Sequence, residues 1–369
     1  MEYREIGKTQ IKASALGFGA MRLPMRDAKG KKSVDVEASV KLIHAGFEKG
    51  INIIDTAFPY CNGESEKVVG LAIKDWKLKN RNSRIYLSTK FPAWQAVRTG
   101  DYRYYLEMQL KALDTGFIDF YHFHSLNNEY FESKVIKLGL IEEAQKAKRE
   151  GLIRHIAFSF HDVPEVMKKI IDTGVFEAVL CQYNILDRVN EEAMSYARQK
   201  GLGVFIMGPL AGGRVLDLHV PDIEKLALKF VISNPDVSVA FSGMERVSDV
   251  EKNTGIAAGP FNFSEKEKEI LEKMLKQGRI KDMINCNNCR YCLPCPNNVA
   301  IPRIFKIYNY YLLTNLKGNS AWQYNNIGLD NEEERADKCS QCGQCEEKCP
   351  QNLKIMELLK EVRLNLSGS

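Results

Sequence analysis

Short apolar runs alternate with amphipathic stretches over the first three quarters of the chain. Seven of these runs are rich in β-branched residues and almost continuously apolar, which is typical of parallel strands buried on both faces. They are 51–57, 84–90, 117–125, 153–160, 178–184, 203–209 and 237–243. Seven strand–helix units over about 220 residues suit a closed (β/α)8 TIM barrel better than an open sheet. The sequence therefore predicts an α/β chain built on such a barrel.

Predicted helices separate the strands, and several of them end in Lys or Arg followed by Gly, a typical helix stop. They cover 36–50, 141–151, 163–174, 190–201 and 224–234. We expect the last barrel helix at 264–275, where Ser264 and Glu267 have the spacing of a capping box. The eighth strand is expected near 255–261, and residues 1–24 are predicted to form a β-hairpin ahead of the barrel.

The composition changes after Gly278, where cysteine, proline and asparagine become frequent. Eight of the ten cysteines lie between Cys286 and Cys349, in two runs. Apolar residues recur at helical spacing between the runs, which predicts a mostly helical segment. We therefore expect two domains, a barrel over 1–280 and a smaller, cysteine-rich domain over 281–369.

Both cysteine runs have the spacing of iron–sulfur ligands. They are Cys286, Cys289, Cys292 and Cys295, followed by Pro296, and Cys339, Cys342, Cys345 and Cys349, followed by Pro350. The second run has the C-x2-C-x2-C-x3-C-P spacing and resembles a bacterial ferredoxin, whereas the first is one residue tighter before its last cysteine. In such two-cluster proteins three cysteines of a run hold one cluster, and the fourth ligates the other cluster.

The ferredoxin resemblance implies a ferredoxin-like domain with two [4Fe–4S] clusters and crossed ligation. One cluster would take Cys286, Cys289, Cys292 and Cys349, and the other would take Cys339, Cys342, Cys345 and Cys295. Disulfides and zinc are the alternatives. The rest of the chain holds only Cys61 and Cys181 and no signal peptide is visible, so we expect a reducing, cytoplasmic location, which argues against disulfides. Zinc sites usually set two C-x2-C pairs apart in the sequence.

Charge and hydropathy argue against two classes of partner. The net charge is +5 over 369 residues, and basic residues are scattered among acidic ones along the chain. We therefore predict no basic face for nucleic acid. No apolar run reaches the length of a membrane span, so we expect no membrane partner either.

Four polar residues at or near the predicted strand ends are catalytic candidates, because TIM-barrel active sites lie at the carboxyl ends of the strands. They are Asp55, Tyr60, Lys90 and His124. A lysine ammonium beside a tyrosine stabilises the phenolate and lowers the phenol pKa from about 10. An aspartate can hold the lysine in place, and a histidine can hydrogen-bond a carbonyl oxygen. The set predicts a proton-transfer site.

The segments around these residues resemble the aldo-keto reductase family. I-D-T-A-F-P-Y-C-N-G-E-S-E-K-V-V-G keeps the family's five-residue separation of Asp and Tyr, S-T-K resembles its lysine strand, and D-F-Y-H-F-H resembles its histidine strand. The resemblance implies that Tyr60 is the general acid and that Lys90 tunes it. Asp55 would hold Lys90, and His124 would orient the carbonyl. The cysteine-rich extension resembles that of a bacterial and archaeal subgroup.

The family resemblance also implies a nicotinamide dinucleotide, NAD(H) or NADP(H), held by side chains at the strand ends. The implied contacts are Ser159, Gln182, Met207, Gly208, Pro209, Leu210, Ser242, Gly243, Met244 and Asn253. Three positions depart from the family pattern, since Phe160 replaces an Asn, Met207 a Tyr and Asp249 an Arg. An aspartate cannot bind a 2′-phosphate, so we expect NADH to be used at least as well as NADPH, with Arg246 as the nearest substitute cation.

Three further residues receive secondary interpretations. We expect His122 to point to the opposite strand face from His124 and to pack against helices. His161 lies beyond a predicted strand end and is expected to belong to a loop. Trp94 is a candidate either for lining the substrate pocket or for plain packing.

Two functions fit the sequence. The first is an oxidoreductase that reduces a small aldehyde or ketone by hydride transfer from NAD(P)H, with the clusters linking it to a ferredoxin or flavoprotein partner. A flavin is a further candidate cofactor, because nicotinamide exchanges hydride whereas a cluster passes single electrons. The alternative is an iron–sulfur electron-transfer protein whose barrel is a docking scaffold or binds a flavin.

Overall fold

The chain folds into two compact units in a computed structural model. The structure describes residues 1–28, 31–218, 220–276, 282–286, 288–314, 317–328 and 333–367. The first unit is Met1–Pro209 with Ala227–Phe261, and the second is Leu210–Leu226 with Asn262–Ser369. The predicted domain boundary between residues 280 and 281 lies outside the described residues.

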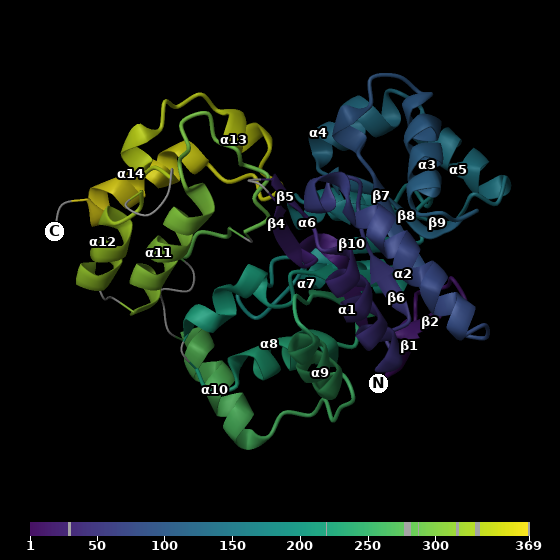
Figure 1. Ribbon diagram of the computed structural model, residues 1–369, viewed down its shortest axis with the longest axis horizontal. Helices are drawn as coiled ribbons and strands as arrows, with labels where there is room; N and C mark the ends of the chain where they lie inside the picture. Colours follow the sequence, from purple (N-terminus) through teal and green to yellow (C-terminus); the bar gives the residue numbers. More distant parts are fainter. Residues whose placement is uncertain are drawn as a thin grey trace. The chain divides into compact units, whose positions relative to one another are not determined.

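Eight strands close into a barrel in the first unit (Figure 1). They are β3 (Leu16–Gly19), β6 (Ile53–Asp55), β7 (Tyr86–Phe91), β8 (Ile118–Leu126), β9 (Ile153–Phe160), β10 (Ala178–Gln182), β11 (Gly203–Met207) and β12 (Val239–Gly243). Their order around the barrel follows the chain, β12 pairs with β3, and every neighbouring pair is parallel. The seven strands predicted from the sequence are present, and the predicted TIM-barrel fold is confirmed.

Helices follow the strands along the chain, as in other (β/α)8 folds. They are α1 (Val36–Glu48), α2 (Ser65–Lys79), α3 (Asp101–Ala112), α4 (Asn128–Tyr130), α5 (Leu140–Arg149), α6 (Pro164–Ile171), α7 (Glu191–Lys200), α8 (Ile223–Ser233) and α9 (Val247–Ile256). Local signals fix several of their ends. Asp35 accepts a hydrogen bond from the Ala38 N–H at 3.0 Å and caps α1, and Gly201 ends α7 in the left-handed conformation.

The eighth strand differs from its predicted place. It is β3, and the region expected to contain it, 255–261, instead holds the end of α9 (Val247–Ile256) and the turn that follows it. The predicted opening hairpin is present as β1 (Tyr3–Glu5) and β2 (Lys12–Ser14), and β4 (Met25–Ala28) pairs with β5 (Lys31–Val34). Because β3 reads Leu-Gly-Phe-Gly, it lacks the β-branched signal of a strand. Gly17 is needed there, since a Cβ would lie 2.4 Å from the Phe241 ring.

The barrel interior is filled by alternate residues of the strands. Ile53, Phe120, Leu180, Phe205 and Val239 belong to one buried apolar cluster, and each lies near the amino-terminal half or the middle of its strand. The carboxyl ends of the strands carry polar residues instead. This layering separates a packed core from the end of the barrel where a site can form.

The second unit is mostly helical, as predicted. Its helices are α10 (Glu265–Lys276), α11 (Ile301–Thr314), α12 (Lys317–Asn325), α13 (Gln344–Glu347) and α14 (Ile355–Leu366). The predicted capping box of α10 is present, because Ser264 N–H donates to Glu267 Oε2 at 2.8 Å and Glu267 N–H donates to Ser264 Oγ at 3.2 Å. An apolar core that includes Ile304, Phe305 and Val362 joins α11 to α14. Among the described helices, none combines the length and apolar character needed to cross a membrane.

Candidate active site and cysteine cavities

The four predicted catalytic residues come from neighbouring parts of the barrel. Asp55 ends β6, Tyr60 begins the short helix η2 (Tyr60–Gly63), Lys90 is the penultimate residue of β7, and His124 lies near the end of β8. All four therefore lie at the carboxyl ends of adjacent strands, where parallel pairing brings them together.

Lys90 is held by an ion pair inside the barrel. Its Nζ lies 2.6 Å from Asp55 Oδ2 and donates to the Thr56 carbonyl oxygen at 2.7 Å. Asp55 Oδ1 accepts a further hydrogen bond from Ser88 Oγ at 2.7 Å. Only 1% of the Lys90 side chain is exposed. A buried charge needs both a counterion and hydrogen bonds, and Lys90 has both.

Burial acts on both members of this pair. It raises the pKa of Asp55 and lowers the pKa of Lys90, because both charged forms lose hydration. The attraction between the two charges opposes both shifts. The pair therefore places one cation in a nearly water-free part of the site.

Tyr60 and His124 lie next to this cation. Lys90 Nζ lies 4.6 Å from the centre of the Tyr60 ring. The rings of Tyr60 and His124 meet edge to face, with their centres 6.0 Å apart. The half-buried Trp94, from the short helix η3 (Ala93–Gln95), lies 5.0 Å from the His124 ring. The structure thus gathers a phenol, an ammonium, an imidazole and an indole around one point.

The expectation for His122 is wrong. Residues two apart in a strand share a face, so His122 points to the same side as His124 and Phe120, into the barrel. Its ring centre lies 5.9 Å from that of Phe205, and its Nε2 lies 3.0 Å from Ser88 Oγ. Since Ser88 donates its only hydroxyl hydrogen to Asp55, His122 must donate to Ser88. His122 therefore holds Ser88, which in turn donates a hydrogen bond to Asp55 of the ion pair.

Both buried histidines are kept neutral. Burial and the nearby Lys90 charge lower the pKa of His122 to about 3, and the same causes lower the pKa of His124 well below its ordinary value. His161 lies in the loop directly after β9, as expected, and burial and the nearby Lys90 charge lower its pKa to about 4.

Among the predicted cofactor-binding residues, Gln182 has a side-chain amide that is free to bind a ligand. It ends β10 and is buried, and neither its Nε2 nor its Oε1 has a hydrogen-bond partner within the described residues. A Cβ on Gly208 would lie 3.0 Å from Gln182 Oε1, so glycine leaves room beside the amide. The other predicted carboxamide residue, Ser159, is buried on β9 and accepts from the Ser125 N–H at 2.7 Å. An amide that lacks partners fits a ligand with its own amide.

The remaining predicted cofactor residues lie around the ends of β11 and β12. Met207 and Ser242 are on these strands, Gly243 ends β12, and Gly208, Pro209 and Met244 follow them, whereas Leu210 begins a segment of the second unit. Asn253 of α9 donates to Ser242 Oγ at 3.2 Å. This hydrogen bond ties α9 to the end of β12.

Asp249 caps α9. Its Oδ2 accepts from the backbone N–H groups of Glu245 and Arg246 at 3.1 and 3.0 Å. The Arg246 side chain is 80% exposed and lies 3.8 Å from Asp249 Oδ1. The Asp249 carboxylate is thus held by the backbone, while the Arg246 side chain is mostly exposed.

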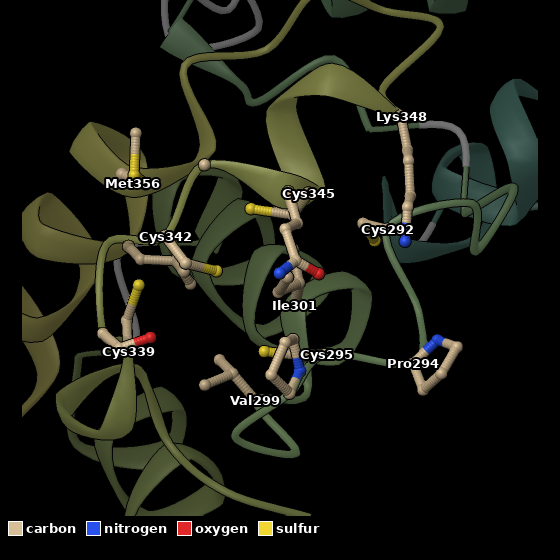
Figure 2. Close-up of a pocket in the computed structure, with 15 residues that line it drawn as sticks. Cys292, Pro294, Cys295, Val299, Ile301, Cys339, Cys342, Cys345, Lys348 and Met356 are labelled. Carbon is tan, nitrogen blue, oxygen red and sulfur yellow. The ribbon is translucent and has the colours of Figure 1, made fainter.

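The cysteines of the second unit line two cavities. One is lined by Cys292, Cys295, Cys339, Cys342 and Cys345, and the other by Cys286, Cys289, Cys292 and Cys349. In Figure 2 the side chains of Cys339, Cys342, Cys345 and Cys295 surround the first cavity, with Cys292 to one side. Each cavity therefore combines three cysteines of one run with the last cysteine of the other, the grouping that crossed ligation requires.

The two cysteine loops repeat one backbone conformation. Asn288 and Arg290 flank Cys289 with φ of 56° and 66°, and Gln341 and Gly343 flank Cys342 with φ of 56° and 78°. Left-handed backbone costs a non-glycine residue roughly 1–2 kcal/mol. Three of these four positions nevertheless hold a residue with a Cβ, so the loop shape is imposed by its surroundings.

This repeat continues beyond the loops. Asn298 and Asn352 are both left-handed, and each lies three residues after the last cysteine of its run. Helices α11 and α14 then begin at Ile301 and Ile355, six residues after those cysteines. The sequence indicated only paired cysteine runs. The structure extends the repeat to a loop, a turn and a helix.

A polynuclear cluster fits these cavities better than a single metal ion. Within the described residues, no three His, Cys, Asp or Glu side chains converge closely enough to hold one metal ion. Four zinc thiolates would have to lie about 2.3 Å from one ion. The cysteines here instead surround a volume, as the ligands of a cubane do.

Comparisons with known proteins agree with both parts of the chain. The model of the Aldo/keto reductase family matches residues 15–220, and that of a 4Fe-4S dicluster domain matches residues 285–354. L-galactose dehydrogenase from Arabidopsis thaliana is 28% identical over 291 residues, which cover 69% of this chain and 87% of that protein. Uncharacterized oxidoreductase YqkF from Bacillus subtilis (strain 168) is 24% identical and covers 75% and 97%.

A solved structure has the same barrel fold. The holo form of aldo-keto reductase AKR11C1 from Bacillus halodurans aligns with a TM-score of 0.62 at 24% identity, over 74% of this chain and 96% of that chain. This likeness concerns the fold alone. The family match covers more than half of the 369 residues and includes Asp55, Tyr60 and Lys90. The chain therefore belongs to the aldo/keto reductase family and is an oxidoreductase with a 4Fe-4S dicluster domain.

Proposed function

We propose that this oxidoreductase reduces a small aldehyde or ketone with NAD(P)H as hydride donor. The observation that carries the proposal is the buried Lys90–Asp55 pair beside the Tyr60 ring. A family match alone does not require these side chains to meet. Their arrangement supplies a cation next to a phenol in a site that excludes most water.

Tyr60, Lys90 and His124 would have different roles in the proton transfer. Tyr60 would give its hydroxyl proton to the carbonyl oxygen while the carbonyl carbon accepts the hydride, which forms an alcohol. The Lys90 ammonium would stabilise the phenolate left on Tyr60. His124, which is neutral because of its burial, would donate a hydrogen bond to the same oxygen and orient the substrate.

The nicotinamide cofactor would lie across the ends of β10, β11 and β12. Gln182 supports this proposal, because its buried amide can bind a carboxamide through both atoms. NAD(P)H, when bound there, supplies the hydride. Ser159 would complete the carboxamide contacts, and Ser242 and Asn253 would contact the phosphates.

We expect NADH to bind at least as tightly as NADPH. A 2′-phosphate needs a cation, and at the family's arginine position Asp249 presents a carboxylate. Dissociation constants for both cofactors measure this directly. NADPH binding tighter by roughly tenfold, about 1.4 kcal/mol, would contradict the expectation and would point to Arg246.

The two cysteine cavities would hold two [4Fe–4S] clusters. The proposed ligands are Cys286, Cys289, Cys292 and Cys349 for one, and Cys339, Cys342, Cys345 and Cys295 for the other. The clusters would exchange single electrons with a ferredoxin or flavoprotein in the cytoplasm. A bound flavin could convert between hydride and single electrons, and extraction of the purified protein tests for it.

The decisive experiment uses the full chain purified without oxygen. Reduced cofactor is mixed with a panel of aldehydes and ketones, and cofactor oxidation and alcohol formation are followed together. L-galactose, the sugar in the name of the Arabidopsis relative, is tested in the reverse direction with oxidised cofactor. Turnover of a carbonyl supports the proposal. If neither NADH nor NADPH binds, the barrel is instead a scaffold of an electron-transfer protein.

A further inference from the structure

A cavity lies in the barrel unit, at the opposite end of the strands from the candidate active site. It has a volume of about 380 Å³ and is lined by the second half of α2, by residues before and in β7, and by the segment before β8. Lys90 and His124 lie at the other ends of these same strands. Ligand pockets typically have volumes of about 300–1,000 Å³, so the cavity is large enough for a small molecule.

Four cations line this cavity. They are Lys74, Lys77, Arg81 and Arg84. The stretch 74–84 holds five Lys or Arg residues and one acidic residue, Asp75. The fold brings four of these cations around one hollow, because the residues after α2 lead directly into β7. Clustered cations repel one another, so such an arrangement favours an anion between them.

Two of the four cations already have acidic partners. Lys74 pairs with Asp114 at 2.5 Å, and Arg84 pairs at 2.5 Å with Asp119, which is 2% exposed. Lys77 and Arg81 form no ion pair and no side-chain hydrogen bond with the described residues. Both are exposed lining residues. The cavity therefore keeps two positive charges that no residue in the described chain neutralises.

The wall beside these charges is apolar. Ile73, Leu87 and Leu113 are buried lining residues, while Leu78 is 72% exposed. The half-buried Phe117 ring lies 5.4 Å from the Arg84 guanidinium and 4.1 Å from that of Arg154. Exposed leucine next to a hollow is available for an apolar ligand group. One side of the cavity thus suits an anion and the other an apolar body.

We infer that this cavity binds a small amphipathic anion, a carboxylate or phosphate ester on a short apolar body. Lys77 and Arg81 hold the anionic group, and Leu78 and Phe117 contact the apolar body. Charge-assisted hydrogen bonds to lysine and arginine are stronger than neutral ones and select for the anion. The inference concerns a separate site and does not depend on the proposed carbonyl reduction.

Binding of three matched probes tests the inference on the full chain, reconstituted with its clusters without oxygen. Octyl phosphate and octanoate carry the anion, and octyl glucoside has the same apolar chain without a charge. Isothermal titration is expected to give binding of one or both anions at least tenfold tighter than that of the glucoside. Inorganic phosphate, which lacks the apolar body, is expected to bind at least tenfold more weakly than octyl phosphate.

A pair of double variants locates the binding site. Lys77→Gln with Arg81→Gln is expected to weaken octyl phosphate binding at least tenfold. Lys67→Gln with Lys79→Gln is the control, because both residues are exposed on the same helix and neither lines the cavity. Thermal unfolding of both variants checks that the fold is kept.

Three outcomes would overturn the inference. Wild-type protein that binds neither anion has no such site. Equal losses in the two double variants would mean that net charge alone attracts the probe. Unchanged binding in the Lys77→Gln, Arg81→Gln variant would place the ligand elsewhere. The ratio of octanoate to octyl phosphate affinity then shows which of the two headgroups the cavity prefers.

Discussion

At the scale of single residues, the site depends on one buried charge. Lys90 is among the largest fully buried side chains, and desolvation of an ammonium costs several kcal/mol unless it is compensated. Asp55, Ser88 and His122 form a chain of hydrogen bonds that compensates it. The sequence predicted the pair from its motif. It could not reveal the Ser88–His122 support, because that contact joins two strands.

Replacement of Tyr60 by Phe tests the proposed proton donor. Tyr60→Phe removes one hydroxyl and keeps the ring that contacts Lys90 and His124. We expect carbonyl reduction to fall by about 10²–10⁴-fold, the usual contribution of general acid catalysis. Cofactor affinity should change little, because the nicotinamide contacts lie on other strands. Steady-state rates and cofactor titrations measure the two effects separately.

Two further variants complete that test. Lys90→Met should lower the rate similarly, because the phenolate loses its stabilising ammonium. Tyr104→Phe is the matched control, since Tyr104 is 61% exposed on α3 and should react at the wild-type rate. Wild-type turnover by Tyr60→Phe would show that Tyr60 is not the proton donor.

His122 also makes the barrel sensitive to acid. Its pKa is lowered from 6.5 to about 3, so between these values the unfolded chain binds a proton that the folded chain does not. Stability from this group is therefore present above pH 6.5 and is lost as the pH falls toward 3. At about pH 5.5 the loss from one such histidine is about 1.4 kcal/mol.

The variant His122→Gln isolates this contribution, because a glutamine can still donate to Ser88 but does not titrate. Urea unfolding of wild type and variant is compared at about pH 7.5 and about pH 5.5. We expect the free energy of unfolding to fall less in the variant. Identical pH dependence in the two proteins would show that His122 is protonated in the folded barrel. The variant keeps His124 and His161, so some dependence should remain.

At the scale of elements, a buried polar network ties α2 and α3 to the strand that carries Lys90. Glu66 Oε1 accepts from Thr89 Oγ1 at 2.5 Å and from Gln109 Nε2 at 2.5 Å. Gln109 also donates to the Lys90 carbonyl oxygen at 3.0 Å and accepts from Tyr121 at 2.6 Å. A fully connected buried network fixes orientation more than it adds stability. It holds β7 in register beside the site.

Two helical glycines should respond oppositely to alanine. A Cβ on Gly70 of α2 would lie 2.4 Å from the Leu113 carbonyl oxygen, whereas a Cβ on Gly255 of α9 has nothing within 4 Å. Gly70→Ala is expected to destabilise the barrel by roughly 1–3 kcal/mol through overpacking. Gly255→Ala should stabilise it by roughly 0.5 kcal/mol, because alanine favours helix. Urea unfolding followed by tryptophan fluorescence compares them, and equal effects would contradict the close approach of α2 to Leu113.

Most elements of the barrel could be predicted from the sequence, and β3 shows why one could not. The seven predicted strands have continuous apolar runs of β-branched residues, which is a strong local signal. Leu16–Gly19 has two glycines in four residues, and its pairing with β12 and β6 depends on contacts distant in sequence. The apolar segment 255–261 was mistaken for a strand because short apolar runs do not distinguish a strand from a helix end.

At the scale of the whole molecule, one chain combines an aldo/keto reductase barrel with a 4Fe-4S dicluster domain. The resemblance to two-cluster ferredoxins predicted crossed groups of cysteines, and the lining of the two cavities is compatible with them. The repeated backbone of the two loops was not predictable, since Arg290 and Gln341 carry no sequence signal for left-handed conformations. The repeat is compatible with crossed ligation, because each run ends at a cysteine that lines the other run's cavity and a helix begins six residues later.

Crossed ligation makes a prediction that pairs of substitutions can test. Wild-type protein should contain about eight iron atoms per chain. Cys286→Ala with Cys349→Ala removes two ligands from one cavity, so that cluster should be lost while the other keeps four cysteines and about four iron atoms.

Cys286→Ala with Cys295→Ala is the matched control with one cysteine removed from each cavity, and it should leave no fully ligated cluster. Iron content and the electron paramagnetic resonance of the reduced protein distinguish these outcomes. If each cluster were instead held by a single run, the second variant would keep one intact cluster and the first would keep none. Zinc in place of iron in the wild-type protein would contradict both arrangements.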